Sequence, residues 1–116
     1  MSYQSFARCF ALLASTRRYL HLHLPPTTPP DPNPLQAVNP EDFPDYLDYV
    51  TTPMDLSTVQ SKLTAGDYEG SFDAFAEDVR LVWRNCMSYN AENSLISQHA
   101  QQLSKMFEGL LAKVPR

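Results

Sequence analysis

The side chains that could do chemistry in this chain of 116 residues do not form a catalytic set. The histidines are His21, His23 and His99, and none stands with a serine or cysteine at a recognisable nucleophile turn. His21 and His23 form a His-x-His pair, but no further ligand stands nearby at metal-binding spacing. We therefore expect solvated histidines at a helix end, with no catalytic residue, no metal and no other cofactor.

Carboxylates gather in one part of the chain, at Asp42, Asp45, Asp48 and Asp55. Paired carboxylates could serve as a general acid and base, but loop solubility and helix capping are the favoured interpretation here. The chain has only three glycines, so it lacks a glycine-rich phosphate loop.

The more informative polar group is the primary amide of Asn90, which follows Tyr89 where a helical pattern stops. Such an amide offers two donors and an acceptor to a ligand. Its competing interpretation is a helix C-cap, because asparagine tolerates the left-handed conformation that ends helices. With Phe43, Tyr46 and Tyr49 it could form an apolar pocket containing one amide, which suits a small, neutral, flat polar group.

Helices must position these residues, because four stretches carry apolar residues at three- and four-residue spacing. We expect helices over 2–22, 55–64, 71–90 and 94–112. Asp55, Ser71 and either Asn93 or Ser94 are the expected N-caps. Trp83 lies on the apolar face of the third helix, so we expect it in the core. No stretch has useful strand-like alternation, and no internal repeat is found.

The segment from residue 23 to 54 is expected to be a long loop, because nine of the ten prolines lie in it. Scattered apolar residues from Leu35 onward indicate that its second part is ordered. Residues 25–34 have few such anchors and are interpreted either as mobile or as a proline-rich ligand for another domain. The predicted fold is therefore a single all-α domain over residues 1–116, an antiparallel four-helix bundle with one long connection.

The composition and net charge limit the classes of protein to which this chain can belong. The apolar fraction is 43% and the net charge is −4, so we expect a globular domain and no general nucleic-acid binding. No apolar run approaches the roughly 20 residues that a membrane span needs, and we expect no secretory signal. Cys9 and Cys86 both fall on apolar helix faces, which favours buried thiols over a disulfide.

Several motifs resemble those of bromodomains. They are FPDYLDYVTTPMDLSTV at 43–59, LTAGDY at 63–68, DVRLVWRNC at 78–86, and Tyr89-Asn90. The resemblance covers about residues 3 to 112 and is strongest from 38 to 90. It implies a left-handed four-helix bundle that binds N-acetyl-lysine between the first long loop and the loop joining the last two helices. It further implies a monomeric, nuclear, non-enzymatic module whose partners are acetylated peptides, histone tails among them.

The resemblance also implies a role for individual positions. Asn90 matches the asparagine whose amide donates to the acetyl carbonyl, and Tyr46 matches the tyrosine that reaches this carbonyl through a water. Tyr89 and Val38 match positions that line the pocket, and Ile96 matches the gatekeeper at its rim. Cys86 and Asn85 match positions near the pocket floor, where Asn85 is the amide that anchors the loop.

The sequence departs from the family pattern just before Val38. Many bromodomains carry Trp-Pro-Phe at the start of this shelf and then Pro-Val, whereas this chain reads PNPLQAV over residues 32–38. Ala37 stands where a proline is usual, and we expect Leu35 or Pro34 to replace the phenylalanine. The pocket should therefore be less aromatic on this side. The alternative function is an atypical bromodomain that acts as an interaction scaffold without binding acetyl-lysine.

Overall fold

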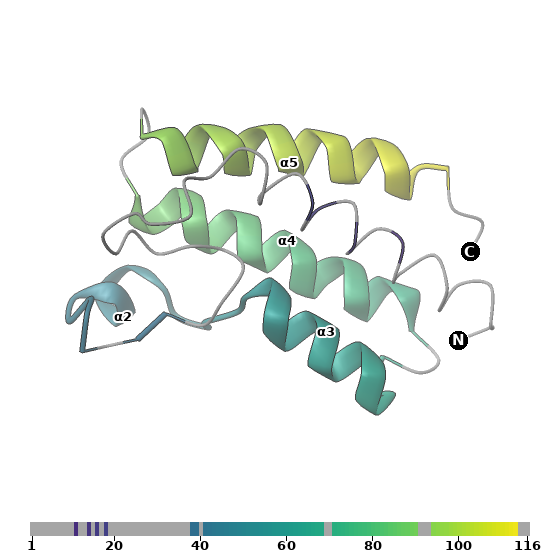
Figure 1. Ribbon diagram of the computed structural model, residues 1–116, viewed down its shortest axis with the longest axis horizontal. Coiled ribbons are helices and arrows are strands. Elements are labelled where there is room, and N and C mark those ends of the chain that lie inside the picture. Colours follow the sequence, from purple (N-terminus) through teal and green to yellow (C-terminus); the bar gives the residue numbers. More distant parts are fainter. Residues whose placement is uncertain are drawn as a thin grey trace.

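All secondary structure described by the computed structural model is helical. The described residues are Ala11, Ala14, Thr16, Arg18, Val38, Asn39, 41–68, 71–90 and 94–113. The helices, labelled as in Figure 1, are α2 (Tyr46–Tyr49), α3 (Leu56–Ala65), α4 (Phe72–Tyr89) and α5 (Leu95–Leu111). The helix expected over 2–22 lies outside the described residues, except for the four single residues, which are helical.

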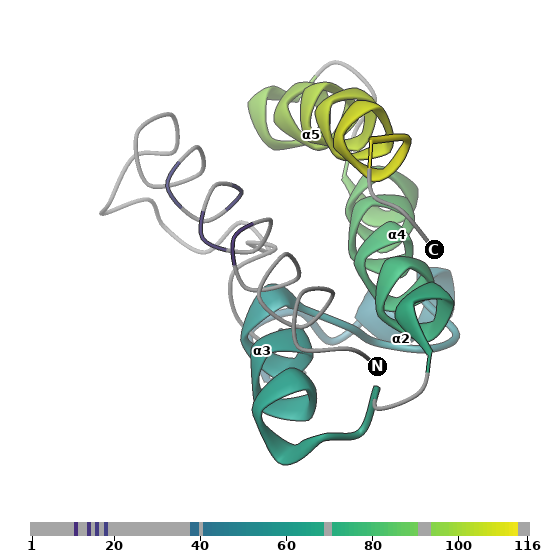
Figure 2. The same cartoon turned by 90° about the vertical axis from the view of Figure 1, so that its right-hand side faces the viewer.

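The helices pack around α4. It runs antiparallel to α5 on one side, and α3 contacts it on another (Figures 1 and 2). α2 lies against the end of α4 where that helix stops and where α5 begins (Figure 1). Within the described residues, no helix is both long enough and apolar enough to cross a membrane.

Each of the three longer helices begins at a side chain that accepts a hydrogen bond from its first turn. Asp55 accepts from the backbone N–H of Thr58 at 3.0 Å, and Ser71 and Ser94 do the same for the third residue after each of them. These bonds satisfy N–H groups that have no partner inside the helix. The predicted caps Asp55 and Ser71 are thus confirmed, and the choice left open at the last helix falls on Ser94.

One hydrophobic core joins α3, α4 and α5. Trp83 is 1% exposed, which confirms its predicted place in the core. Phe75 is the central aromatic residue, with ring centroids 5.7 Å from Tyr68 and 6.3 Å from Phe107. The fully buried aliphatic members are Leu56, Val59, Leu63, Val79, Val82, Leu103 and Leu111.

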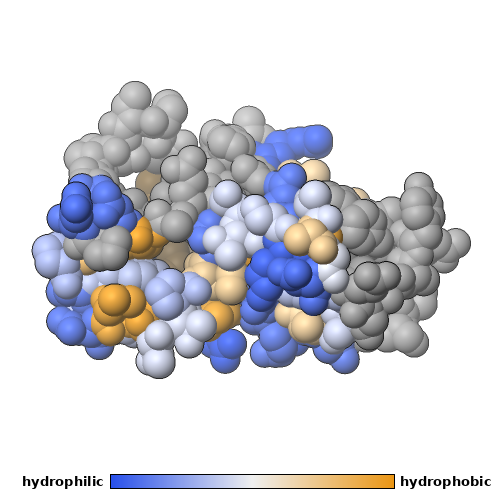
Figure 3. Space-filling view, turned by 90° about the horizontal axis from the view of Figure 1, so that it is seen from below, coloured by the Kyte–Doolittle hydropathy of each residue, from blue (hydrophilic) through white to orange (hydrophobic). Residues whose placement is uncertain are grey.

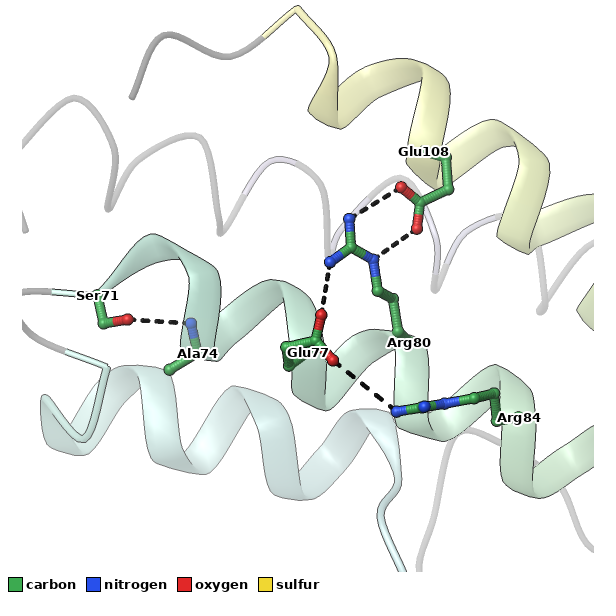
Figure 4. A network of polar contacts seen from close by, with 6 residues as sticks. All are labelled: Ser71, Ala74, Glu77, Arg80, Arg84 and Glu108. Atoms are coloured by element: carbon green, nitrogen blue, oxygen red, sulfur yellow. Dashed lines mark hydrogen bonds and ion pairs between the residues drawn. The ribbon is translucent and has the colours of Figure 1, made fainter.

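Charged side chains tie the same helices together at the surface. Arg80 of α4 donates two hydrogen bonds to Glu108 of α5, at 2.6 and 2.9 Å, and a third to Glu77 at 2.7 Å (Figure 4). These carboxylates raise the pKa of Arg80. Lys62 of α3 reaches Asp78 of α4 at 2.6 Å. The exposed pairs of Arg80 contribute at most about 1 kcal/mol each, so the core dominates stability.

The second half of the expected loop contains one helical turn, α2, that the sequence did not predict. It follows Pro44, and the N–H of Val50 closes it by donating to the carbonyl of Tyr46 at 3.0 Å. The turn places Tyr46 and Val50 inward, at 6% and 1% exposure. Burial of these two side chains explains why a proline-flanked segment holds helical geometry without a side-chain cap at Asp45.

Candidate functional site

Asn90 ends α4 through its side chain. Asn90 is the C-cap residue of α4, as the competing interpretation held, but its backbone is extended, with φ −87° and ψ 151°, and not left-handed. The carbonyl of Cys86 accepts hydrogen bonds from both the backbone N–H of Asn90, at 3.1 Å, and its Nδ2, at 2.8 Å. No described residue donates a hydrogen bond to the Asn90 Oδ1. The amide is therefore held in place by the helix end while its oxygen has no partner among the described residues.

Cys86 lies directly beneath this amide and is 6% exposed. Its Sγ is 3.6 Å from the Asn90 Nδ2 and 3.8 Å from the carbonyl oxygen of Ile96 in α5. Burial raises the pKa of the Cys86 thiol to about 12, although the bond from Asn90 opposes this shift. The thiol is consequently neutral at physiological pH and lies in contact with the amide of Asn90.

Tyr89 is the centre of an aromatic cluster beside Asn90. Three rings from the α2 region meet it in edge-to-face contacts, with centroid distances of 6.0 Å for Phe43, 5.0 Å for Tyr46 and 5.6 Å for Tyr49. Its hydroxyl donates to the Asp45 carboxylate at 2.5 Å, and this bond raises the pKa of Tyr89 to about 12. The cluster therefore attaches α2 to the end of α4.

Tyr46 presents a neutral phenol inside this cluster. Burial raises its pKa, and the neighbouring Cys86 and Asp55 act in the same direction. A buried neutral hydroxyl can both donate and accept a hydrogen bond. Tyr46 can therefore serve a polar ligand, directly or through water, without carrying charge.

The loop between α2 and α3 is fixed by Asn85. Its Nδ2 donates to the carbonyl of Thr52 at 2.8 Å, and the residue is 7% exposed. This bond confirms the loop-anchoring role that the resemblance implies for Asn85. Since α2 and α3 flank the anchored loop, the bond also limits how far the aromatic cluster can move from α4.

The structure brings five of the seven predicted site residues to this end of the bundle. Cys86 contacts both Asn90 and Ile96, and Ile96 is 7% exposed and packs with Ala100. The ring of Tyr46 packs against the ring of Tyr89. Val38 is half-buried, and Leu35 lies outside the described residues.

The sequence missed the role of Asp45. It was interpreted as a soluble loop residue, but it accepts the hydrogen bond from Tyr89. No local pattern could have revealed this contact, because Tyr89 lies 44 positions further along the chain and the Asp45 side chain does not cap α2. The described residues hold no group of three or more histidine, cysteine or acidic side chains that could bind a metal.

The family model for bromodomains matches residues 28–102 of this chain. The chain belongs to the bromodomain family. Its fold agrees with that of the second bromodomain of Candida albicans Bdf1, solved with a bound imidazopyridine. The TM-score is 0.77 at 28% identity, covering 95% of this chain and 99% of the other. The predicted all-α, left-handed four-helix bundle is thereby confirmed.

The proteins similar in sequence to this chain are much longer than it is. The histone acetyltransferase GCN5 of Yarrowia lipolytica is 38% identical over 80 residues, which are 69% of this chain and 17% of GCN5. A bromodomain-containing protein of Dictyostelium discoideum is 38% identical over 111 residues, or 94% of this chain and 6% of that protein. The chain thus spans less than a fifth of the length of these relatives.

Proposed function

We propose that this bromodomain binds N-acetyl-lysine in acetylated peptides, histone tails among them. The observation that carries the proposal is the amide of Asn90, which is half-buried at the end of α4 beside the Tyr89 cluster. One N–H of its Nδ2 donates to the Cys86 carbonyl at 2.8 Å, and the second N–H of the same amide is the donor that we assign to the acetyl carbonyl.

The chemistry of the site favours a neutral ligand. Tyr46, Tyr89 and Cys86 are all uncharged at physiological pH, because their ordinary pKa values lie above it and the site raises each of them further. Burying an ammonium group against such side chains costs several kcal/mol, whereas an acetylated lysine is a neutral amide. Discrimination therefore comes largely from rejection of charge.

The expected affinity is modest. One methyl group, an aliphatic stem and one hydrogen bond contribute only a few kcal/mol, and the entropy lost on association offsets part of this. We expect dissociation constants between about 1 µM and 1 mM for a peptide with a single acetyl-lysine.

The deciding experiment is titration calorimetry of this chain with histone-tail peptides, each in an acetylated and an unmodified form. Measurable heat from acetylated peptides only is the expected result. Equal binding of both forms, or binding of neither across a broad peptide set, would contradict the proposal. The chain would then act as an interaction scaffold, the function expected if the altered segment before Val38 abolishes acetyl-lysine binding.

Three further parts of the proposal concern the setting of this module. The chromatin-associated relatives support a nuclear location, and the module acts as a monomer without catalytic activity of its own. Imaging of the tagged full-length protein tests the location. Sedimentation of this chain tests the monomer, and an obligate dimer would contradict it.

A further inference from the structure

Two pairs of consecutive residues meet at the candidate site. Tyr46 directly follows Asp45 in the chain, and Asn90 directly follows Tyr89. The carboxylate of Asp45 accepts a hydrogen bond from the hydroxyl of Tyr89 at 2.5 Å, and the ring of Tyr46 lies 5.0 Å from the ring of that tyrosine. One pair therefore holds Tyr89 at two points, with the carboxylate at its hydroxyl and the phenol ring at its own ring.

The carboxylate of Asp45 serves this contact and not its own helix. An aspartate directly before a helix usually caps the first turn, but the side chain of Asp45 forms no capping hydrogen bond with α2. Asp48, in the first turn of α2, is exposed, and no described residue pairs with its carboxylate. Of these two carboxylates, only Asp45 thus joins α2 to α4.

The second members of the two pairs both approach Cys86. Tyr46 is 6% exposed, and Cys86 acts on the pKa of its phenol, so the two groups are near each other. The Sγ of Cys86 lies 3.6 Å from the Nδ2 of Asn90. A phenol carried by α2 and an amide at the end of α4 therefore approach one thiol, and their separation depends on how α2 is held against α4.

α2 cannot hold this position by itself. It is a single helical turn, and a turn of this length is unstable without tertiary contacts. Leu47 and Tyr49 remain 58% and 60% exposed, and Figure 3 shows strongly apolar surface set among hydrophilic residues at the end of the molecule where α2 lies. Among the described residues, α2 is thus held from its inner side, through its contacts with α4.

The hydrogen bond and the ring contacts hold α2 in different ways. Edge-to-face rings tolerate a range of centroid distances, whereas a hydrogen bond requires a narrow distance and direction. The rings supply apolar contact area, and the bond between Asp45 and Tyr89 fixes where α2 lies along α4. A ligand that contacts groups on both elements binds more tightly when these groups are already in place, because less freedom is lost on binding.

We propose that Asp45 is a positioning residue for acetyl-lysine, acting without contact to the peptide. Its bond to the hydroxyl of Tyr89 holds the phenol of Tyr46 and the amide of Asn90 at a separation that serves a single acetyl carbonyl. The inference rests on the proposed function and deepens it. Because the bond is exposed, we expect its loss to weaken binding of acetylated peptide by about three- to tenfold.

The test is a double-mutant cycle measured by titration calorimetry with one acetylated peptide. Asp45→Ala and Tyr89→Phe each remove one partner of the bond, and Tyr89→Phe keeps the ring. We expect each variant to bind about three- to tenfold more weakly than the parent. The double variant should be no weaker than the weaker single variant, because both changes break the same bond. Losses that multiply in the double variant would overturn the inference.

Two further variants separate the bond from the charge of Asp45. Asp45→Asn keeps an oxygen that can accept from Tyr89, so it should restore most of the affinity lost in Asp45→Ala. Asp48→Ala removes the same charge three residues away, where no described residue pairs with it, and should bind as the parent does. If Asp48→Ala weakens binding as much as Asp45→Ala, the carboxylates act by attracting the peptide and the inference is wrong.

A last control separates position from stability. Gly66, at the end of α3, has φ 83°, so Gly66→Ala strains the backbone without touching either pair. With every variant fully folded in the assay, as checked by urea unfolding, Gly66→Ala should keep the affinity of the parent. An affinity that falls in step with stability across all variants would overturn the positioning role of Asp45.

The outcomes also separate this inference from the proposed function. A parent chain that binds only the acetylated peptide, with Asp45→Ala binding as tightly as the parent, would overturn the inference alone. A parent chain that binds acetylated and unmodified peptide equally, or neither of them, would overturn acetyl-lysine binding, and the inference would fall with it.

Discussion

The hydroxyl of Tyr89 donates a hydrogen bond to the carboxylate of Asp45, and this 2.5 Å contact joins residues 44 positions apart in the chain. It connects the last residue of α4 to the residue before α2, while the three rings around Tyr89 fill the space between them. This bond, together with the ring contacts, therefore holds the aromatic cluster beside Asn90.

Alkaline pH should weaken this link. The pKa of Tyr89 is raised from its ordinary value of 10 to about 12 in the folded chain. The bond's contribution to stability is therefore complete below about pH 10 and is lost as the pH rises through about 12. We expect Tyr89→Phe to have a lower free energy of unfolding than the parent at neutral pH, as measured by urea unfolding. Between about pH 10 and 12, the variant should lose less stability than the parent.

The control for this prediction is Tyr49→Phe, which also removes a phenol from the cluster. No described residue forms a hydrogen bond with the Tyr49 hydroxyl, so this variant should follow the alkaline profile of the parent. Identical profiles for the parent and Tyr89→Phe would show that the bond to Asp45 does not contribute to stability.

Replacement of glycine by alanine should have opposite effects on stability at two positions. Gly109 is exposed within α5, and an added Cβ would meet no atom within 4 Å, so Gly109→Ala should stabilise the chain by about 0.5–1 kcal/mol. Gly66 ends α3 with φ 83°, in the left-handed region that disfavours a Cβ. Gly66→Ala should therefore destabilise by about 1 kcal/mol or more. If chemical denaturation shows that both variants change the free energy of unfolding in the same direction, one of these backbone arguments is wrong.

Trp83 should matter for stability and not for recognition. Its side chain is 1% exposed between α3, α4 and α5, and no described residue accepts a hydrogen bond from its Nε1. Its contribution is thus apolar packing, and Trp83→Ala should cost about 3–5 kcal/mol. The milder Trp83→Phe should keep peptide affinity unchanged. A Trp83→Ala chain that is fully stable yet fails to bind would contradict this placement.

Local patterns explain which parts of the fold the sequence could predict. The caps Asp55 and Ser71 lie within three residues of the N–H groups they serve, so their types and spacing suffice to identify them. Burial of Trp83 follows equally from three- and four-residue spacing along one helix face. The left-handedness of the bundle was predicted only from the family resemblance.

Long-range and conformational details could not be predicted in this way. Asp45 looks like any soluble loop carboxylate until the fold brings Tyr89 to it. Asparagine tolerates a left-handed backbone but does not require one, so the type of residue at position 90 left the extended conformation undetermined. α2 is a single turn held by the burial of Tyr46 and Val50, and one turn is too short for helical periodicity to register.

Asn90 separates stability from binding more sharply than any other described residue, and Asn85 is its matched control. Asn85 lies near the end of α4 and Asn90 directly follows that helix, and both donate from Nδ2 to a backbone carbonyl at 2.8 Å. Asn90→Ala removes one helix-end bond without imposing backbone strain, because φ is −87°. It should cost about 1–2 kcal/mol of stability and abolish binding of acetylated peptide in calorimetry.

Asn90→Phe should also abolish binding, because it removes the amide and fills the site with an apolar ring, again with a stability change of about 1–2 kcal/mol. Asn85→Ala should behave differently. It removes a side chain that is 7% exposed and leaves the carbonyl of Thr52 without its donor, so it should destabilise at least as much. The chain that remains folded should still prefer acetylated over unmodified peptide. If Asn90→Ala binds acetylated peptide as the parent does, the amide of Asn90 does not recognise the acetyl group, and its bond to the Cys86 carbonyl is its whole role.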